Sequence, residues 1–303
     1  MRARGVAAVA TFALFVAACG PTGSSTEAAN DDAITIASFD FDESEVVADL
    51  YAGALRLAGF DVSHVRRAGT REVVLPALER GLIEVVPEYA GSAVGFLGGE
   101  PSTDRDTTHA RLRVLLGARG IETLDAAPAQ SRNGLVVTSE TASDLALRTI
   151  SDLRAVASEM SLGGPPECPE RALCLPGLEQ TYGLRFARFL PLDAGGPITA
   201  EAVLRGTVDV GMLFTSDGSL TERGLVLLRD DRGLQPAENI TPVVAREAVL
   251  RFGPELVDVI DTVSVALTTD ELRTLNVLVR LGTSPEEAAA AWLTDNGFSR
   301  GAG

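Results

Sequence analysis

The chain lacks lysine altogether and has only 2 histidines and 3 cysteines among its 303 residues. Schiff-base chemistry and Walker-type phosphate loops both need a lysine ammonium, so the composition excludes them. The 26 basic residues, all arginine, face 42 acidic residues, which gives a formal net charge of −16. A surface this acidic repels a phosphate backbone, and the charge therefore argues against nucleic-acid binding.

Catalytic and metal-binding patterns are also scarce. His64 and His109 lie in unrelated contexts, and their spacing suits neither a metal site nor a nucleophile–base pair. The sequence contains no Gly-x-Ser-x-Gly elbow and no Gly-x-Gly-x-x-Gly loop. Carboxylates are scattered, and no pair is singled out for hydrolysis. These absences argue against an enzyme and predict no cofactor and no metal; an extracytoplasmic enzyme is kept as an alternative.

Residues 1–18 are predicted to be a signal peptide, because two arginines precede an apolar run too short to span a bilayer. The run ends in Val16-Ala17-Ala18-Cys19-Gly20, which resembles a bacterial lipobox. That resemblance implies lipidation of Cys19 and a protein anchored outside the cell; the alternative is an ordinary signal peptide with an incidental cysteine. Residues 19–32 are small and polar and are predicted to be a flexible tether.

The other two cysteines, Cys168 and Cys174, lie six residues apart. An exported protein reaches an oxidising compartment, so we expect them to form one local disulfide. A metal site is the alternative, but two cysteines with no histidine nearby are poor zinc ligands.

Short β-branched runs alternate with helical periodicity along most of the chain. The first run, residues 34–36, precedes a helical pattern over 45–58. Further strands are expected at 60–65, 82–86 (ended by Pro87), 135–138, near 161, 208–212 and 225–228, and helices at 70–80, 105–118, 151–156 and throughout 245–296. This alternation predicts an α/β fold with mainly parallel sheets.

One segment is repeated in pattern. Residues 77–89 and 202–214 each read as helix, glycine stop, short strand and then an aromatic residue eight positions after the glycine. Ligands of open α/β sheets bind beyond the carboxyl ends of strands. Tyr89 and Phe214 are therefore expected at equivalent strand ends, facing each other from two lobes. The alternative is that both are core aromatics that close a strand.

An ordered series of short motifs covers nearly all of the chain after the leader. The motifs lie at residues 36–44, 69–71, 76–78, 87–92, 149–153, 175–178, 182–184, 208–210, 216–218 and 267–272. Together they resemble substrate-binding proteins of osmoprotectant ABC transporters, which bind glycine betaine, carnitine or choline. The resemblance implies a monomeric two-lobed fold of the periplasmic-binding-protein type II with the ligand cleft between the lobes. It also implies an ABC permease and its ATPase as partners.

Under this resemblance, lobe 1 comprises residues 33–132 plus 236–303, and lobe 2 comprises 133–235. In the relatives, a quaternary ammonium group sits in a cage of aromatic rings, whose electronegative faces attract the cation. The matching motifs imply that Tyr89 and Phe214 supply two rings of this cage.

Two further positions are implied for the carboxylate of a ligand. Ser92 matches a hydroxyl that helps to hold it, and Arg171 matches an arginine that clamps it. For Arg171, a surface charge is the alternative.

The chain also departs from the family pattern. Cage tyrosines of the relatives fall at about Asn133 and near Ala200, and a polar or basic position is taken by Phe39, which is either a gained ring or a core residue. These changes leave open a same-fold protein for a different small polar solute. Asp40 and Glu43 are expected to cap the first helix rather than to contact the ligand.

Overall fold

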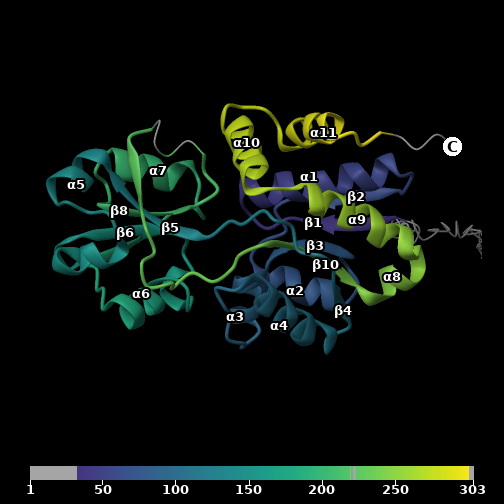
Figure 1. Cartoon of the computed structure of the whole chain (residues 1–303), viewed down its shortest axis with the longest axis horizontal. Helices are drawn as coiled ribbons and strands as arrows, with labels where there is room; N and C mark the ends of the chain where they lie inside the picture. Colours follow the sequence, from purple (N-terminus) through teal and green to yellow (C-terminus); the bar gives the residue numbers. More distant parts are fainter. Residues whose placement is uncertain (1–32, 219, 221–222, 300–303) are drawn as a thin grey trace, which may run out of the picture. The chain divides into compact units, whose positions relative to one another are not determined.

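The computed structural model describes residues 33–218, 220 and 223–299. The predicted signal peptide (1–18), the predicted tether (19–32) and Cys19 lie outside the described residues. Within the described part, the chain forms two five-stranded sheets, each with helices on its faces (Figure 1). We call each sheet with its helices a lobe.

The first lobe contains the sheet in the order β2-β1-β3-β10-β4. Its strands are β1 (Ile34–Ala37), β2 (Val62–Val65), β3 (Val85–Tyr89), β4 (Ile121–Thr123) and β10 (Ile240–Ala245). Its helices are α1 (Asp42–Leu57), α2 (Arg71–Glu79), α3 (Ala90–Phe96), α4 (Arg105–Gly117), α8 (Arg246–Phe252), α9 (Pro254–Ala266), α10 (Thr269–Arg280) and α11 (Pro285–Asp295).

The second lobe contains the sheet in the order β7-β6-β8-β5-β9. Its strands are β5 (Asn133–Thr138), β6 (Ser161–Gly164), β7 (Arg188–Pro191), β8 (Val210–Phe214) and β9 (Leu225–Leu228). Its helices are α5 (Ser139–Asp144), α6 (Leu175–Tyr182) and α7 (Pro197–Leu204), with 3-10 turns at Ile150–Ala155, Ala157–Glu159 and Cys168–Glu170. The first of these turns replaces the α-helix expected at 151–156.

The chain crosses between the lobes twice, before β5 and before β10 (Figure 1). The two crossing segments lie side by side and are joined by an antiparallel bridge between Gln130 and Asn239. The expectation of mainly parallel sheets is wrong at β5 and β10, which pair antiparallel to both of their neighbours. A helical crossover within one sheet makes successive strands parallel, but these two strands enter their sheets from the other lobe.

Strand β3 extends past the proline that was expected to end it. Pro87 lies directly opposite Pro242 of β10, and the pairing continues on both sides of this position. The Pro242 carbonyl accepts the Leu124 N–H, so the backbone of this residue faces β4 and not Pro87. The missing N–H groups of the two opposed prolines therefore remove no bond between β3 and β10. The same Pro242 explains why β10 was missed, since proline argues against a central strand. The strand therefore reaches Tyr89.

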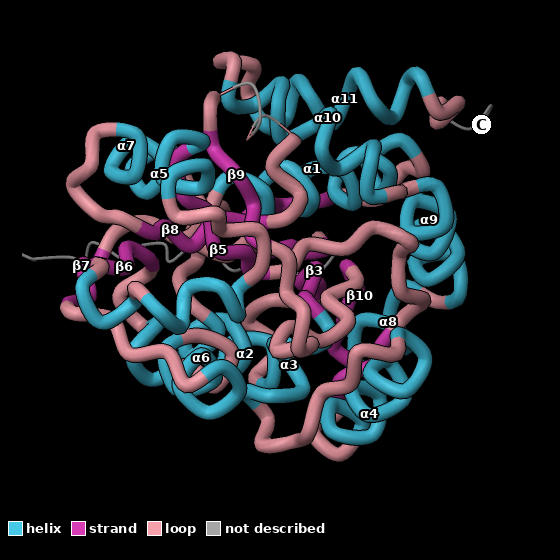
Figure 2. Tube along the Cα trace, turned by 60° about the vertical axis from the view of Figure 1, so that its left-hand side comes forward, coloured by secondary structure: helices cyan, strands magenta, loops and turns pink. Residues whose placement is uncertain are grey.

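Helix α1 is the centre of the first core. Val46, Leu50 and Tyr51 are fully buried, and the Tyr51 hydroxyl lies 3.1 Å from Ser264 Oγ of α9. Helices α10 and α11 pack over α1 (Figure 2). The helix begins before the expected residue 45 because its first turn is acidic, which suits the positive end of the helix dipole.

The second lobe has apolar clusters on both faces of its sheet. One is formed by residues such as Leu153, Leu162 and Leu178, and the other by Val136 and Val203, with α7 against β8. Among the described residues, none of the helices has the length and apolar character that crossing a membrane requires.

The contact of α7 with β8 can be tested at Gly211. A Cβ atom at this position would lie 2.5 Å from Val203 Cγ2 and 3.2 Å from Thr199 Cγ2. We expect Gly211→Ala to lower the free energy of unfolding in urea by about 1–3 kcal/mol, because overpacking forces neighbours apart. Gly117→Ala is the matched control: nothing lies within 4 Å of its Cβ, and it ends α4. The control should raise the free energy of unfolding by less than about 1 kcal/mol. An equal decrease of this free energy in both variants would refute the packing argument.

Candidate functional site

A cavity of about 400 Å³ is lined by residues of both lobes. The first lobe contributes the end of β3 and the loop before α1, and the second contributes the end of β8, the start of β5 and the loop between Cys168 and Cys174. Carboxyl ends of strands from two sheets therefore open onto one space, which is where open α/β sheets bind ligands.

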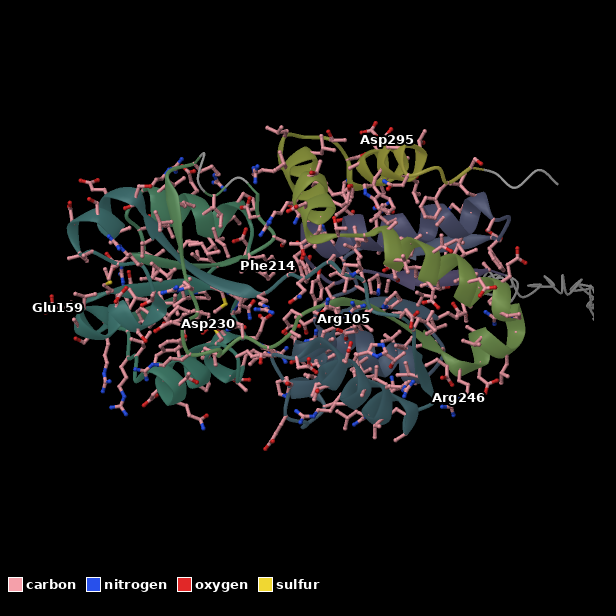
Figure 3. All side chains as sticks on the ribbon, in the orientation of Figure 1. Arg105, Glu159, Phe214, Asp230, Arg246 and Asp295 are labelled. Atoms are coloured by element: carbon pink, nitrogen blue, oxygen red, sulfur yellow. A yellow bond between two sulfur atoms is a disulfide. The ribbon has the colours of Figure 1, made fainter. Side chains whose placement is uncertain are left out.

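Tyr89 and Phe214 both line this cavity, and each is the last residue of its strand. Phe214 is labelled in Figure 3, at the end of β8. The ring of Phe41 lies between them, with centroids 5.7 Å from Tyr89 and 5.3 Å from Phe214. The two strand-end aromatics that the repeated pattern singled out are thus brought to one cavity through a third ring.

The backbone of a glycine lies directly against the Phe214 ring. Gly195, at φ +69°, lies so close that a Cβ atom there would be 2.5 Å from two ring carbons. Only glycine combines this close approach with a positive φ at no steric cost.

Phe39 also lines the cavity, although only 4 % of it is exposed. Its ring is parallel to that of Phe41, at a centroid distance of 6.2 Å, and the Arg71 guanidinium lies 5.2 Å from its centroid. Phe41 and Phe96, a further lining residue, were missed. The signal for Phe41 was its position two residues after Phe39, in the same motif at residues 36–44.

Glu43 connects the aromatic wall to the rest of the molecule. The Tyr89 hydroxyl donates to Glu43 Oε1 at 3.0 Å, and the Ser216 hydroxyl and Asn276 Nδ2 (2.6 Å) donate to Oε2. Burial, together with the Glu43 carboxylate, raises the pKa of Tyr89 well above its usual range. Tyr89 therefore stays protonated and donates.

The capping roles expected for Asp40 and Glu43 are wrong. Helix α1 has Phe41 at its N-cap and no side-chain cap bond. Asp40 instead forms an ion pair with Arg67, and Glu43 is 4 % exposed and fully engaged as an acceptor. A buried carboxylate without hydrogen-bond donors costs more free energy than a helix end without a side-chain cap.

Ser92 holds a carboxylate of the protein itself. Its N–H and hydroxyl donate to Glu238 at 3.0 and 2.6 Å, and both residues line the cavity. Burial raises the pKa of Glu238 to about 7, opposed by the Ser92 hydrogen bonds and by Arg71. Glu238 was not singled out from the sequence, where it lies in an unremarked crossing segment.

Arg71 and Glu88 form a second buried group beside the cavity. Arg71 Nε and Nη2 donate to the two carboxylate oxygens of Glu88 at 2.9 and 2.8 Å, a bidentate pair. Glu88 also accepts the Tyr89 backbone N–H. The pair ties α2 to the end of β3 and so positions Tyr89.

Arg171 reaches the cavity from the second lobe. Cys168 and Cys174 are joined by a disulfide, which closes the loop that carries Arg171 and leaves neither thiol for a metal. Arg171 pairs with Glu72 of α2 at 2.6 Å and lies 5.4 Å from the Phe96 ring centroid. It is therefore neither a solvated surface charge nor a cation without a counter-ion.

The two positions at which the resemblance implies cage tyrosines have different surroundings. Asn133 begins β5, lines the cavity and is the register partner of Phe214. Ala200 lies in α7, only 1 % exposed and packed with Val203 in the second core, and is not a lining residue. The cavity therefore has an amide at the first position, and the second position is a core residue of α7.

His64 has both a hydroxyl and a carboxylate partner in the fold, which its sequence context did not indicate. His64 Nδ1 lies 2.8 Å from Asp49 Oδ1, and Nε2 lies 3.2 Å from Ser38 Oγ, the order of a serine-hydrolase triad. Ser38 is fully buried, accepts the Arg67 N–H and does not line the cavity. A hydroxyl that no substrate reaches is a structural link between β1, β2 and α1. Among the described residues, no cluster of three or more metal-ligating side chains occurs.

Comparisons with known proteins agree with this architecture. The chain is 27 % identical over 280 residues to the glycine betaine-binding protein YehZ of Escherichia coli (strain K12), covering 85 % of this chain and 88 % of that protein. It is 25 % identical over 271 residues to the carnitine transport binding protein OpuCC of Listeria monocytogenes, covering 88 % and 86 %. A crystal structure titled as a glycine betaine/carnitine/choline ABC transporter superposes with a TM-score of 0.71 at 22 % identity, covering 88 % and 99 %.

The predicted two-lobed α/β fold is confirmed by the two sheets with their helices and by the likeness to solved structures. Residues 32–295 match the family described as the substrate binding domain of ABC-type glycine betaine transport systems. That span is most of the chain, and it confirms the family resemblance that the motifs indicated. The chain belongs to this family of substrate-binding domains, and it is a transport protein, not an enzyme.

Proposed function

We propose that this protein captures a quaternary ammonium solute of the glycine betaine, carnitine or choline type outside the cytoplasm and delivers it to an ABC permease with its ATPase. The observation that carries the proposal is the convergence of Phe39, Phe41, Tyr89 and Phe214 on one cavity between the two sheets. Aromatic faces bind a cation that has no hydrogen-bond donors of its own.

The strength of binding requires several rings. Each cation–π contact contributes roughly 0.5–2 kcal/mol, whereas micromolar affinity corresponds to about 8 kcal/mol. We therefore assign Tyr89, Phe214 and Phe39 to the cage, with Asn133 and Ser92 as polar neighbours. Arg171 is the cation proposed for a ligand carboxylate, and it has to leave Glu72 to serve it.

A different small polar solute is the second candidate. The observation that favours it is the amide of Asn133 at the cavity, at the position where the family resemblance implies a cage tyrosine. One ring fewer lowers the affinity for a cation, and an amide offers a donor and an acceptor that a quaternary ammonium cannot use.

Capture involves movement of the lobes in our proposal. We propose a division of the chain into lobe 1 (33–132 plus 236–303) and lobe 2 (133–235), and the membership of the two sheets in the described residues supports it. The two crossing segments are the proposed hinge, and closure on the ligand prepares a monomer for docking on the permease.

Tyr89 tests the cage directly. We expect Tyr89→Ala to weaken the binding of the quaternary ammonium solute by about tenfold or more, measured by calorimetric titration with glycine betaine, carnitine and choline. Tyr89→Phe is the matched control, because it keeps the ring face and removes only the hydroxyl that donates to Glu43. The control should bind within a few-fold of the wild type. An unchanged dissociation constant for Tyr89→Ala would remove Tyr89 from the site, and no binding by the folded wild type would refute the ligand class.

The proposed membrane anchor rests on Cys19 alone, which lies outside the described residues. Acyl chains on a cysteine hold a protein on a bilayer without a spanning helix. In cells that express the full chain, Cys19→Ala should move the protein from the membrane fraction to the soluble extracytoplasmic fraction and abolish labelling by a fatty-acid analogue. Persistent labelling of the variant would contradict the assignment.

A further inference from the structure

The charged side chains around the cavity do not balance. In the first lobe, Arg71 is one cation beside two buried carboxylates, Glu88 and Glu238. Glu88 accepts hydrogen bonds from Nε and Nη2 of Arg71 in a bidentate pair. The described contacts of the Glu238 carboxylate are with the uncharged donors of Ser92. This wall therefore has one negative charge in excess when Glu238 is ionised.

The opposite wall does not compensate for it. Arg171 is the basic residue that the second lobe brings to the cavity, and Glu72 already neutralises it at 2.6 Å. Glu167, directly before Cys168, and Glu170, inside the disulfide-closed loop, also line the cavity and add negative charge. The cavity as a whole thus offers rings and excess carboxylate, which is the surrounding that a net cation requires.

We infer that Glu238 is the counter-charge of the bound cation and makes the site select quaternary ammonium alcohols such as choline over zwitterions such as glycine betaine. The inference rests on the proposed function, since it concerns the same cavity. A zwitterion would bring a carboxylate into a wall that already has an excess of them, and it gains a partner only if Arg171 gives up Glu72. A choline-type cation keeps every existing pair intact.

The protonation of Glu238 couples this selection to pH. The groups that face it are Arg71 from α2, Glu88 and Tyr89 from β3 and Ser92 from α3; Asp40, Glu167, Glu170 and Arg171 line the same cavity. Burial raises the pKa of Glu238 to about 7, so a large part of it is neutral at pH 6 and most of it is ionised at pH 8. A cation binds the ionised form better, and its binding therefore releases a proton.

The experiment is calorimetric titration of the wild type and Glu238→Gln with choline and with glycine betaine at pH 6 and pH 8. We expect the wild type to bind choline more tightly than glycine betaine, and to bind choline up to about tenfold more tightly at pH 8 than at pH 6. Glu238→Gln should weaken choline binding by about tenfold or more and remove its pH dependence. Glu159→Gln is the control, an exposed change of equal charge outside the cavity (Figure 3).

A second variant tests the same idea without touching a buried group. Glu72→Gln frees Arg171, and Glu72 is half exposed, so the protein should fold normally. Compared with the wild type, the Glu72→Gln variant should bind glycine betaine several-fold more tightly and choline with nearly the same affinity.

Two results would overturn the inference alone: a wild type that prefers glycine betaine at both pH values, or choline binding that Glu238→Gln leaves unchanged. A folded wild type that binds neither compound would instead overturn the proposed function.

Discussion

The buried carboxylate of Glu43 is the interaction on which the site depends. It lies in the first turn of α1 and accepts hydrogen bonds from Tyr89 at the end of β3, from Ser216 after β8 and from Asn276 of α10. An ionised group without such donors would cost several kcal/mol in an apolar surrounding. The need to satisfy one carboxylate thus holds three segments, far apart in the sequence, around the aromatic wall. The hydrogen bond to Glu43 also orients the Tyr89 hydroxyl, so that the face of the ring remains available to line the cavity.

The second constraint is electrostatic. The cavity brings arginines close to rings, but Arg71 and Arg171 each have a carboxylate partner from the first lobe. These ion pairs neutralise both arginines and hold the cavity wall in place. By contrast, the Glu238 carboxylate is in direct contact only with neutral donors. A pocket in a protein of net charge −16 is then well suited to attract and hold a cation. The disulfide between Cys168 and Cys174 restrains the loop that carries Arg171, and so this part of the wall is set by a covalent link as well as by an ion pair.

Several features followed from local patterns and were found in the structure. The repeated helix, glycine, strand and aromatic pattern placed Tyr89 and Phe214 at strand ends, because a glycine stop and a short apolar run act over a few residues. Strand β10 was missed because Pro242 argues locally against it, although in the sheet the Pro242 carbonyl still accepts a hydrogen bond from the Leu124 N–H. The link from Ser38 through His64 to Asp49 was missed for a related reason. These residues come together only after β1, β2 and α1 pack, and their separation in the sequence carries no sign of it.

By itself, the sequence determined the family, the two-lobed α/β class and the strand-end aromatics, because ordered motifs and periodicity are properties of neighbouring residues. Only the tertiary structure decided which charges meet. Ser92 was expected to serve a ligand but donates to Glu238, Arg171 lies against Glu72, and Phe41 joins the two strand-end rings. Such pairings depend on distances across the fold, and a Coulomb or aromatic contact is sensitive to a few ångströms that no spacing along the chain specifies.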